Sequence, residues 1–259
     1  MPEEFVLFAL VGFCAQMIDG ALGMAYGVVS TTFLLGFGVS PALASATVHS
    51  AEVFTTAASA TSHIANRNVE WRALAVLALA GAIGGVVGAF ILTSVDGAVI
   101  RPLITTYLAL MGVWILMKAF RPLPTIEALQ KRALLAPLGV VGGLLDSIGG
   151  GGWGPTVTTT LIGAGGAPRK VIGTVNAAEF IVTSATSAAF LAALLSGHWN
   201  ESMGLMQQGA ALGGLILGGV AAAPLAGFAV RHIPRRALTI LVGVLVIALA
   251  GYQTWQLIG

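Results

Sequence analysis

The chain has 259 residues, of which 57% are hydrophobic and only 8% are charged, with a formal net charge of +2. An average soluble protein has roughly 25% charged residues, so this composition excludes a soluble enzyme and a nucleic-acid-binding protein. The single cysteine, Cys14, cannot form an internal disulfide, which excludes a disulfide-stabilised scaffold. Most of the chain must therefore lie in lipid, and we expect an all-α polytopic membrane protein.

Eight apolar segments follow one another along the chain, separated by short polar joints. Six of them have the length of one crossing, because a helix rises about 1.5 Å per residue and about 20 residues span the hydrocarbon. The other two, 5–36 and 133–163, are too long for one crossing. The single crossings are expected at 41–64, 72–94, 99–120, 168–196, 203–230 and 235–257.

Glycines interrupt each long segment near its middle. The first interruption runs from Asp19 to Gly23, and the second begins at Asp146 and includes four consecutive glycines, 149–152. A glycine inside a helix costs about 1 kcal/mol relative to alanine, so we expect two half-helices in each segment that meet at a glycine tip. Arms of about 14 residues reach only about 21 Å, which favours re-entrant hairpins over two short crossings.

Sliding the sequence along itself by 127 residues superposes two copies of one unit without a gap. Apolar composition alone would match Gly, Ala and Leu often, but it would not align Asp with Asp and Glu with Glu. Other matched pairs include Gly12 with Gly139, Gly23 with Gly150, Thr31-Thr32 with Thr158-Thr159, and Thr47 with Thr174. We expect a first transmembrane repeat at 1–120, a cytoplasmic linker at 121–132 and a second repeat at 133–259, each a broken helix pair followed by three transmembrane helices.

The basic residues predict the orientation of the repeats. All twelve lie at or near the end of an expected crossing, and all except Arg101 fall on one face if each broken segment counts as an even number of crossings. Because positively charged loops stay in the cytoplasm, we expect cytoplasmic joints at 65–71, 119–132, 164–169 and 231–235, with both termini outside. The second repeat is then inverted relative to the first, as in many secondary transporters. The acidic N-terminus, with Glu3 and Glu4, predicts no removable signal peptide.

Four of the ten acids lie inside apolar segments, and they form two repeat-related pairs: Asp19 with Asp146, and Glu52 with Glu179. An ionisable group in the membrane costs at least about 2.5 kcal/mol on insertion scales, so its default role is functional. We expect proton coupling from all four. For the two aspartates, capping of the half-helix after the break is an alternative role.

Matched polar stripes run along the helices that follow the breaks. Their members share one helical face: Ser45, His49, Glu52, Thr56 and Ser59 in the first copy, and Asn176, Glu179, Thr183 and Thr186 in the second. In lipid such a face must point into the protein, either as hydrogen-bonding contacts between helices or as the lining of a transport path. We favour the path and expect Thr47, His49, Thr174 and Asn176 to contact the substrate. His49 can titrate near neutral pH, and a hydrogen-bonded core histidine is the alternative.

The two glycine tips are candidate anion sites. Half-helix N-termini present bare backbone N–H groups and the positive end of the helix dipole, which suits a small oxyanion. We expect substrate contacts from Gly23, Gly27, Gly150, Gly151 and Gly152. Tyr26 and Trp153 occupy equivalent positions beside the tips and either wall the cavity or pack against helix glycines. Four acids around an anion would repel it unless some are protonated, and this conflict points to proton coupling.

Other chemistry is not indicated. The sequence has no His or Cys pair at metal-ligand spacing, no nucleophile elbow and no nucleotide-binding loop, so we expect no catalytic residue, metal or cofactor. Two glycine-rich runs, 81–89 and 213–221, are typical of small-residue faces on which helices pack closely.

The chain resembles the TauE/SafE sulfite exporter family, also called the 4-toluene sulfonate uptake permease family. The resemblance rests on a duplicated pattern: a glycine-rich break, then Pro41 or Pro168 after a short joint, then Ala46-Thr47 or Gly173-Thr174 near the helix start. It covers both halves of the chain. It implies an integral inner-membrane transporter of sulfite, sulfonates or related small anions. The first copy departs from the glycine-rich pattern, with Met24, Ala25 and Tyr26 between Gly23 and Gly27.

We therefore expect a secondary active transporter that exports a small anion such as sulfite, coupled to protons, by alternating access at a midplane site between the repeats. It is not an enzyme, its partners are the anion, protons and the lipid bilayer, and a homodimer is compatible with the sequence. Two alternatives remain open: a proton or cation antiporter that uses the intramembrane acids, and a non-transporting membrane module that senses a ligand or binds a partner.

Overall fold

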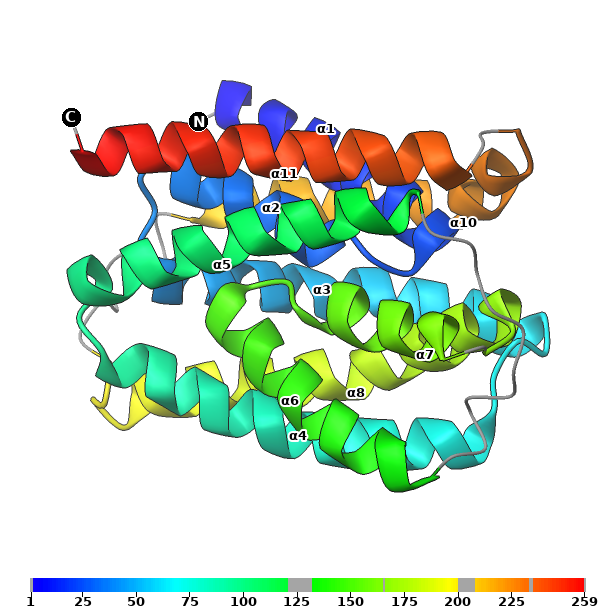
Figure 1. Ribbon diagram of the computed structural model, residues 1–259. Coiled ribbons are helices and arrows are strands. Elements are labelled where there is room, and N and C mark those ends of the chain that lie inside the picture. The colour runs from blue at the N-terminus through cyan, green and yellow to red at the C-terminus, as the bar shows by residue number, and fades with distance from the viewer. Residues whose placement is uncertain (1, 121–131, 165, 200–207, 233–234, 259) are drawn as a thin grey trace.

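The computed structural model describes residues 2–120, 132–164, 166–199, 208–232 and 235–258 (Figure 1). Within these ranges the chain is helical and contains no strand, as the composition predicts. The first half contains α1 (Pro2–Leu22), α2 (Tyr26–Gly36), α3 (Pro41–Ala65), α4 (Trp71–Ser94) and α5 (Gly97–Lys118). The second half contains α6 (Arg132–Gly149), the π-helical turn η2 (Gly154–Thr158), α7 (Thr159–Gly163), α8 (Pro168–Leu195), α10 (Gly209–His232) and α11 (Arg235–Ile258). The predicted linker 121–132 lies almost wholly outside the described residues.

The two broken segments have unequal arms, unlike the arms of about 14 residues expected from the sequence. In the first segment α1 has 21 residues and α2 has 11. In the second, α6 has 18 residues, and η2 and α7 have five each. Gly23 and Gly150 end the longer arms with φ of 68° and 66°, a conformation that glycine adopts without strain and that stops an α-helix. Matched glycines therefore terminate the longer arm in both segments.

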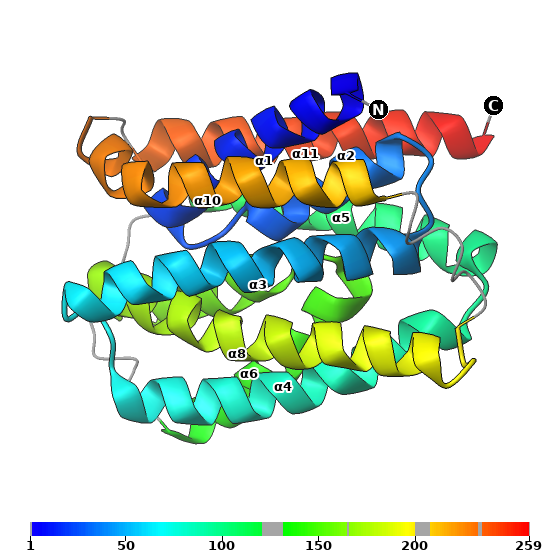
Figure 2. The same ribbon diagram turned by 180° about the vertical axis from the view of Figure 1, so that it is seen from behind.

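Helices of the two sequence halves interleave. Helix α4 packs mainly on α6 and α8, whereas α10 packs mainly on α1 and α3. Helix α5 packs on α11, and α3 packs on α8 between the two groups. Figure 2 shows α3 and α8 running side by side. Each half therefore completes the packing of the other, and the two sequence repeats are not separate bodies in space.

The glycine-rich runs are packing faces, as predicted. A methyl group added at Gly84 would lie 2.1 Å from the carbonyl oxygen of Val140, and one at Gly218 would lie 1.9 Å from that of Ala9. Such distances are far below van der Waals contact, so only glycine lets the backbones of α4 and α6, and of α10 and α1, approach this closely.

Among the described residues, four helical stretches are long and apolar enough to cross a membrane: Trp71–Ser94, Gly97–Lys118, Pro168–Leu195 and Thr239–Leu257. Large apolar side chains such as Leu79, Leu103 and Trp255 are exposed on the outer surface of the bundle. An exposed apolar surface of this kind fits contact with lipid rather than water. The protein is therefore a polytopic helical membrane protein.

Four basic residues, Arg67, Arg169, Lys170 and Arg236, gather at one end of the bundle, whereas Arg101 does not. Arg169 and Lys170 at the start of α8 donate hydrogen bonds to Asn68 Oδ1 at 2.6 Å and to the carbonyl oxygen of Arg67 at 2.9 Å, both in the joint before α4. Arg236 at the start of α11 lies over the ring of Phe120, just after α5. The start of α5, which carries Arg101, lies at the opposite end, where both chain termini are found (Figure 1). This asymmetry agrees with the charge pattern on which the predicted topology rests.

Candidate functional site

The two glycine breaks meet each other inside the bundle. A methyl group added at Gly151 would lie 2.1 Å from the backbone nitrogen of Val28, and one at Gly154 would lie 2.7 Å from the carbonyl oxygen of Gly23. Two threonine hydroxyls join the breaks reciprocally: Thr31 donates to the carbonyl oxygen of Gly150, and Thr158 donates to that of Gly23 at 2.8 Å. The tips are therefore in direct contact, and in this closed arrangement each covers the start of the other's second arm.

Each aspartate accepts a hydrogen bond from the backbone seven residues later. Asp19 Oδ1 accepts from the backbone N–H of Tyr26 at 3.5 Å, and Asp146 Oδ1 accepts from that of Trp153 at 2.9 Å. These N–H groups begin the shorter arms and have no partner within their own helix. The capping role considered for both residues is therefore present, and it leaves the second oxygen of Asp146 available for another contact.

That second oxygen of Asp146 faces His49 on α3. The distance from Oδ2 to His49 Nε2 is 3.2 Å, and both side chains are buried. On the other side of the ring, Nδ1 lies 2.8 Å from the carbonyl oxygen of Ser45. A carbonyl oxygen only accepts, so Nδ1 must carry a hydrogen. The contact between Nε2 and the carboxyl group then requires one further proton, held either by the ring or by Asp146.

The other two acids lie near this pair. Glu52 is one helical turn beyond His49, and its Oε2 lies 3.5 Å from the hydroxyl of Thr183. One ligand atom from each of His49, Glu52 and Asp146 falls within 4.8 Å of the others, which is a spacing that one cation can bridge. Glu179 is in electrostatic range of Asp19, Glu52 and Asp146. We expected no metal site from the sequence. This grouping is not visible there, because His49 and Asp146 are 97 residues apart and share no motif.

The cluster is unbalanced in charge. Asp19, Glu52, Asp146 and Glu179 are all buried, and within the described residues His49 is the only basic side chain in contact with them. An uncompensated buried charge costs several kcal/mol, so four ionised carboxylates around one histidine would be strongly unfavourable. The cluster is therefore suited to binding protons or a cation, either of which neutralises its negative charge.

Tyr26 and Trp153 are packed against neighbouring helices. Both are buried, with 3% and 0% of their surface exposed. The hydroxyl of Tyr26 donates to the carbonyl oxygen of Leu215 at 2.9 Å, and the indole of Trp153 donates to that of Val175 at 3.2 Å. Tyr26 lies against Gly219 and Trp153 against Gly81, so each ring is in contact with a helix glycine.

Both polar stripes are buried. Three of the polar residues on or beside them, Asn176, Thr174 and Thr47, have no hydrogen bond to the four acids in the described part of the chain. Asn176 accepts a hydrogen bond from Ser59 at 3.1 Å and donates to Ile172, so it joins α3 to α8. Thr174 accepts from the backbone N–H of Glu70 at 2.9 Å and fixes the start of α4 at the basic end, away from the aspartates. The hydroxyl of Thr47 is buried without a hydrogen-bond partner in the described part of the chain.

Three polar residues at the site were not singled out by sequence reasoning. Thr31 and Thr158 form the bonds between the tips, and Ser147 accepts a hydrogen bond from Ser45 at 2.6 Å through its backbone oxygen. Thr31 and Thr158 are a matched pair in the 127-residue repeat, so the duplication carried a signal for them. Nothing in the sequence marks Ser147, because its contact is made by the backbone.

Long apolar helices, broken segments that meet inside the bundle and buried acids at their contact define an integral membrane protein built like a secondary transporter. The chain belongs to the sulfite exporter TauE/SafE family, whose pattern matches residues 8–253. A curated relative, the "Probable membrane transporter protein YtnM" of Bacillus subtilis (strain 168), is 41% identical over 246 residues, covering 93% of this chain and 79% of the relative. No solved structure matches the chain. The family and this relative both indicate a membrane transporter.

Proposed function

We propose that the protein is a secondary active transporter that exports a small anion, sulfite or a related sulfur oxyanion or sulfonate, in a proton-coupled cycle. The family description supports the substrate class, and the contact between the two glycine tips supports a midplane site between the sequence halves. The observation that carries the proposal is the proton-holding pair of His49 and Asp146, which lies beside these tips. A transporter of this kind resides in the inner membrane and is not an enzyme.

The anion binds where the tips part. In the closed arrangement Gly151 covers the backbone nitrogen of Val28, so the N–H groups at the start of α2 face the opposite tip instead of a ligand. Separation of the tips exposes them, together with the N–H groups at the start of the second short arm. Backbone N–H groups at helix starts suit a small oxyanion. The proposed contacts are Gly23, Gly27, Gly150, Gly151, Gly152, Tyr26, Trp153, Thr47, His49, Thr174 and Asn176.

Protons enter the cycle because anion and carboxylates compete for the same space. An anion at the tips is repelled by ionised Asp19, Asp146, Glu52 and Glu179, and protonation of the cluster removes that repulsion. Asp146 caps the start of the short arm that follows the second glycine tip, and it shares a proton with His49. The protonation of this pair is therefore linked to the position of the tip. Anion and proton therefore bind together and leave together.

Flux through purified protein tests the proposal. We expect proteoliposomes to take up radiolabelled sulfite faster under an imposed pH gradient, and we expect the double variant Glu52→Gln, Glu179→Gln to lose this acceleration. Arg72→Gln, at the basic end, is the matched surface control. Uptake that ignores the pH gradient removes the coupling, and unimpaired gradient-driven uptake in the double variant removes the role of these two acids.

The proposed orientation has both termini outside and the basic end in the cytoplasm. It follows from the gathering of Arg67, Arg169, Lys170 and Arg236 at one end and the position of Arg101 at the other. A homodimer is compatible with this arrangement. Protease or antibody access to tags at both termini in intact cells tests the orientation, and protection of both tags reverses it.

A proton or cation antiporter is the second candidate, favoured by the cluster of His49, Glu52 and Asp146 within 4.8 Å. Imidazole and carboxylate groups suit several divalent cations. An antiporter moves a cation against protons, and sulfite does not affect it. Flux that depends on a cation and is not inhibited by sulfite would favour this candidate, whereas ligand-linked stability without any flux would favour a sensor.

A further inference from the structure

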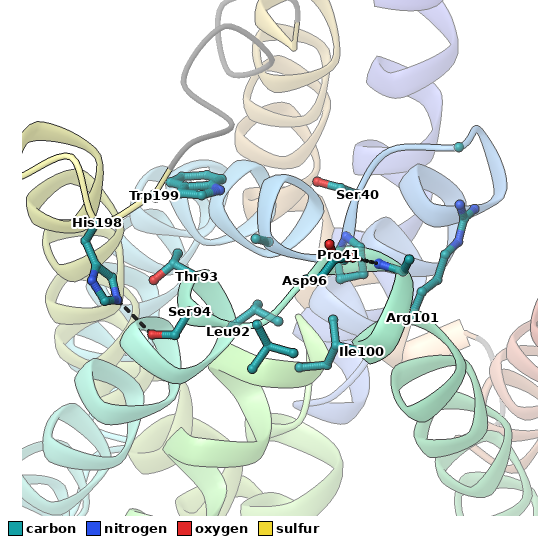
Figure 3. A pocket seen from close by; sticks show the side chains of 15 residues that line it. Ser40, Pro41, Leu92, Thr93, Ser94, Asp96, Ile100, Arg101, His198 and Trp199 are labelled. Atoms are coloured by element: carbon teal, nitrogen blue, oxygen red, sulfur yellow. Dashed lines mark hydrogen bonds between the residues drawn. The ribbon is translucent and has the colours of Figure 1, made fainter.

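A cavity lies at the end of the bundle that carries the termini, apart from the acidic cluster. Its volume is about 680 Å³, and it is bounded by the α2–α3 joint, the α4–α5 joint and the residues that follow α8. Figure 3 shows this cavity, with Trp199 and His198 on one side and Arg101 on the other. The described polar residues that line it are Ser40, Thr93, Ser94, Asp96, Arg101, His198 and Trp199.

Two residues that line this cavity carry a hydrogen-bond donor without a partner in the described part of the chain. Arg101 uses one guanidinium nitrogen to donate to the carbonyl oxygen of Leu35 at 2.7 Å, but its Nε is buried without a partner. The indole Nε1 of Trp199, a residue only 4% exposed, also has no partner within the described ranges. Asp96, the one carboxylate among the described residues that line the cavity, accepts the backbone N–H of Ala98 at 2.7 Å and so caps α5. The cavity therefore offers the guanidinium group of Arg101 to an anion, and the unused N–H of Trp199 is buried beside it.

A short aromatic path connects this cavity with the acidic cluster. The ring of Trp199 lies 6.0 Å from that of Phe190, and the ring of Phe190 lies 6.0 Å from that of His49. Both aromatic residues are buried. A smaller cavity of about 250 Å³ shares Trp199 with the larger one and is also lined by Phe190 and Ser187. The hydroxyl of Ser187 is a further buried polar atom without a partner in the described residues.

We propose that the cavity at Arg101 is the outer vestibule of the transport path and binds the small oxyanion, and that Trp199 and Phe190 form the gate between this vestibule and His49. The inference rests on the proposed anion transport. In the closed arrangement two aromatic side chains separate the vestibule from the proton-holding pair. When they move aside, the unpartnered groups of Trp199 and Ser187 gain an anion or water as hydrogen-bond partner, which offsets the cost of leaving them unpaired.

Thiol accessibility tests the gate without any transport assay. Cys14 is the only native cysteine, so Cys14→Ser gives a background for single cysteines at Ser94, in the vestibule, and at Ser187, whose hydroxyl is buried beside Trp199 and Phe190. In lipid nanodiscs, where both faces are accessible, we expect a charged maleimide to label Ser94→Cys rapidly and Ser187→Cys slowly. Adding Trp199→Ala should accelerate only the second reaction, by about tenfold or more. Equal rates at both positions with Trp199 intact overturn the gate.

Binding tests the vestibule separately. Sulfite should raise the thermal stability of the purified protein, and Arg101→Gln should raise the concentration needed for half the effect by about tenfold, as loss of one charge-assisted contact predicts. Arg72→Gln is the matched control at the other end. An unchanged half-effect concentration in Arg101→Gln overturns the anion site. If the wild-type protein shows sulfite binding and gated labelling but no flux, the proposed transport fails while the vestibule and gate stand.

Discussion

Thr158 donates a hydrogen bond of 2.8 Å to the carbonyl oxygen of Gly23, so a residue at the start of one short arm holds the tip of the opposite broken segment. Thr31 makes the equivalent contact with Gly150. A pair of reciprocal bonds of this kind keeps the tips together and must break if the tips separate. The closed arrangement is therefore stabilised by two equivalent hydrogen bonds, one from each sequence repeat.

Replacement of Thr158 by valine should destabilise this contact. Valine keeps the shape but leaves the carbonyl oxygen of Gly23 buried without its donor, which costs about 1–3 kcal/mol. Thr158→Ser keeps the hydroxyl and is the control. Thermal unfolding in detergent measures the difference, and equal melting temperatures for the two variants would show that the bond does not contribute to stability.

Asp146→Asn and Asp146→Ala should separate capping from proton exchange. The amide oxygen of asparagine can still accept from the backbone N–H of Trp153, so Asp146→Asn should unfold at nearly the wild-type temperature. Asp146→Ala should lose about 1 kcal/mol with the cap. Both remove the carboxyl group that shares a proton with His49, so both should abolish pH-driven sulfite uptake. Retained coupling in the stable asparagine variant would contradict the role of this pair.

Glycine substitutions on two helices should have opposite effects. At Gly84 an added methyl group would lie 2.1 Å from the carbonyl oxygen of Val140, so Gly84→Ala should push α4 away from α6 and lower stability by about 1–3 kcal/mol. At Gly251 on α11 nothing lies within 4 Å, so Gly251→Ala should add up to about 1 kcal/mol through helix propensity alone. Thermal unfolding of the two variants in the same detergent tests both signs.

Tyr26→Phe tests whether this residue packs or binds substrate. Loss of the bond from its hydroxyl to the carbonyl oxygen of Leu215 should lower stability by about 0.5–1.5 kcal/mol. If the ring only packs against Gly219, the KM for sulfite should stay at the wild-type value. A raised KM with unchanged stability would assign the hydroxyl to the anion instead.

The sequence predicted the features that depend on local pattern. Helical spacing predicted buried stripes, glycine runs predicted close packing, and the matched acids marked the residues that surround the tips. Helical spacing defines only a face, however, and it does not say which residue on another helix that face meets. The pairing of His49 with Asp146 and the vestibule at Arg101 depend on how α3, α4, α5 and α8 are set against α6 and each other. These contacts could not be read from one sequence.

Interleaved packing has a consequence for the order of synthesis. Helix α4 leaves the ribosome well before α6 and α8, the helices on which its glycine face packs. During that interval the face around Gly84 lacks the backbone of α6, which contacts it in the native bundle. The first half therefore cannot reach its final packing while it is still being made, and the native bundle forms by rearrangement within the membrane after the second half has been inserted.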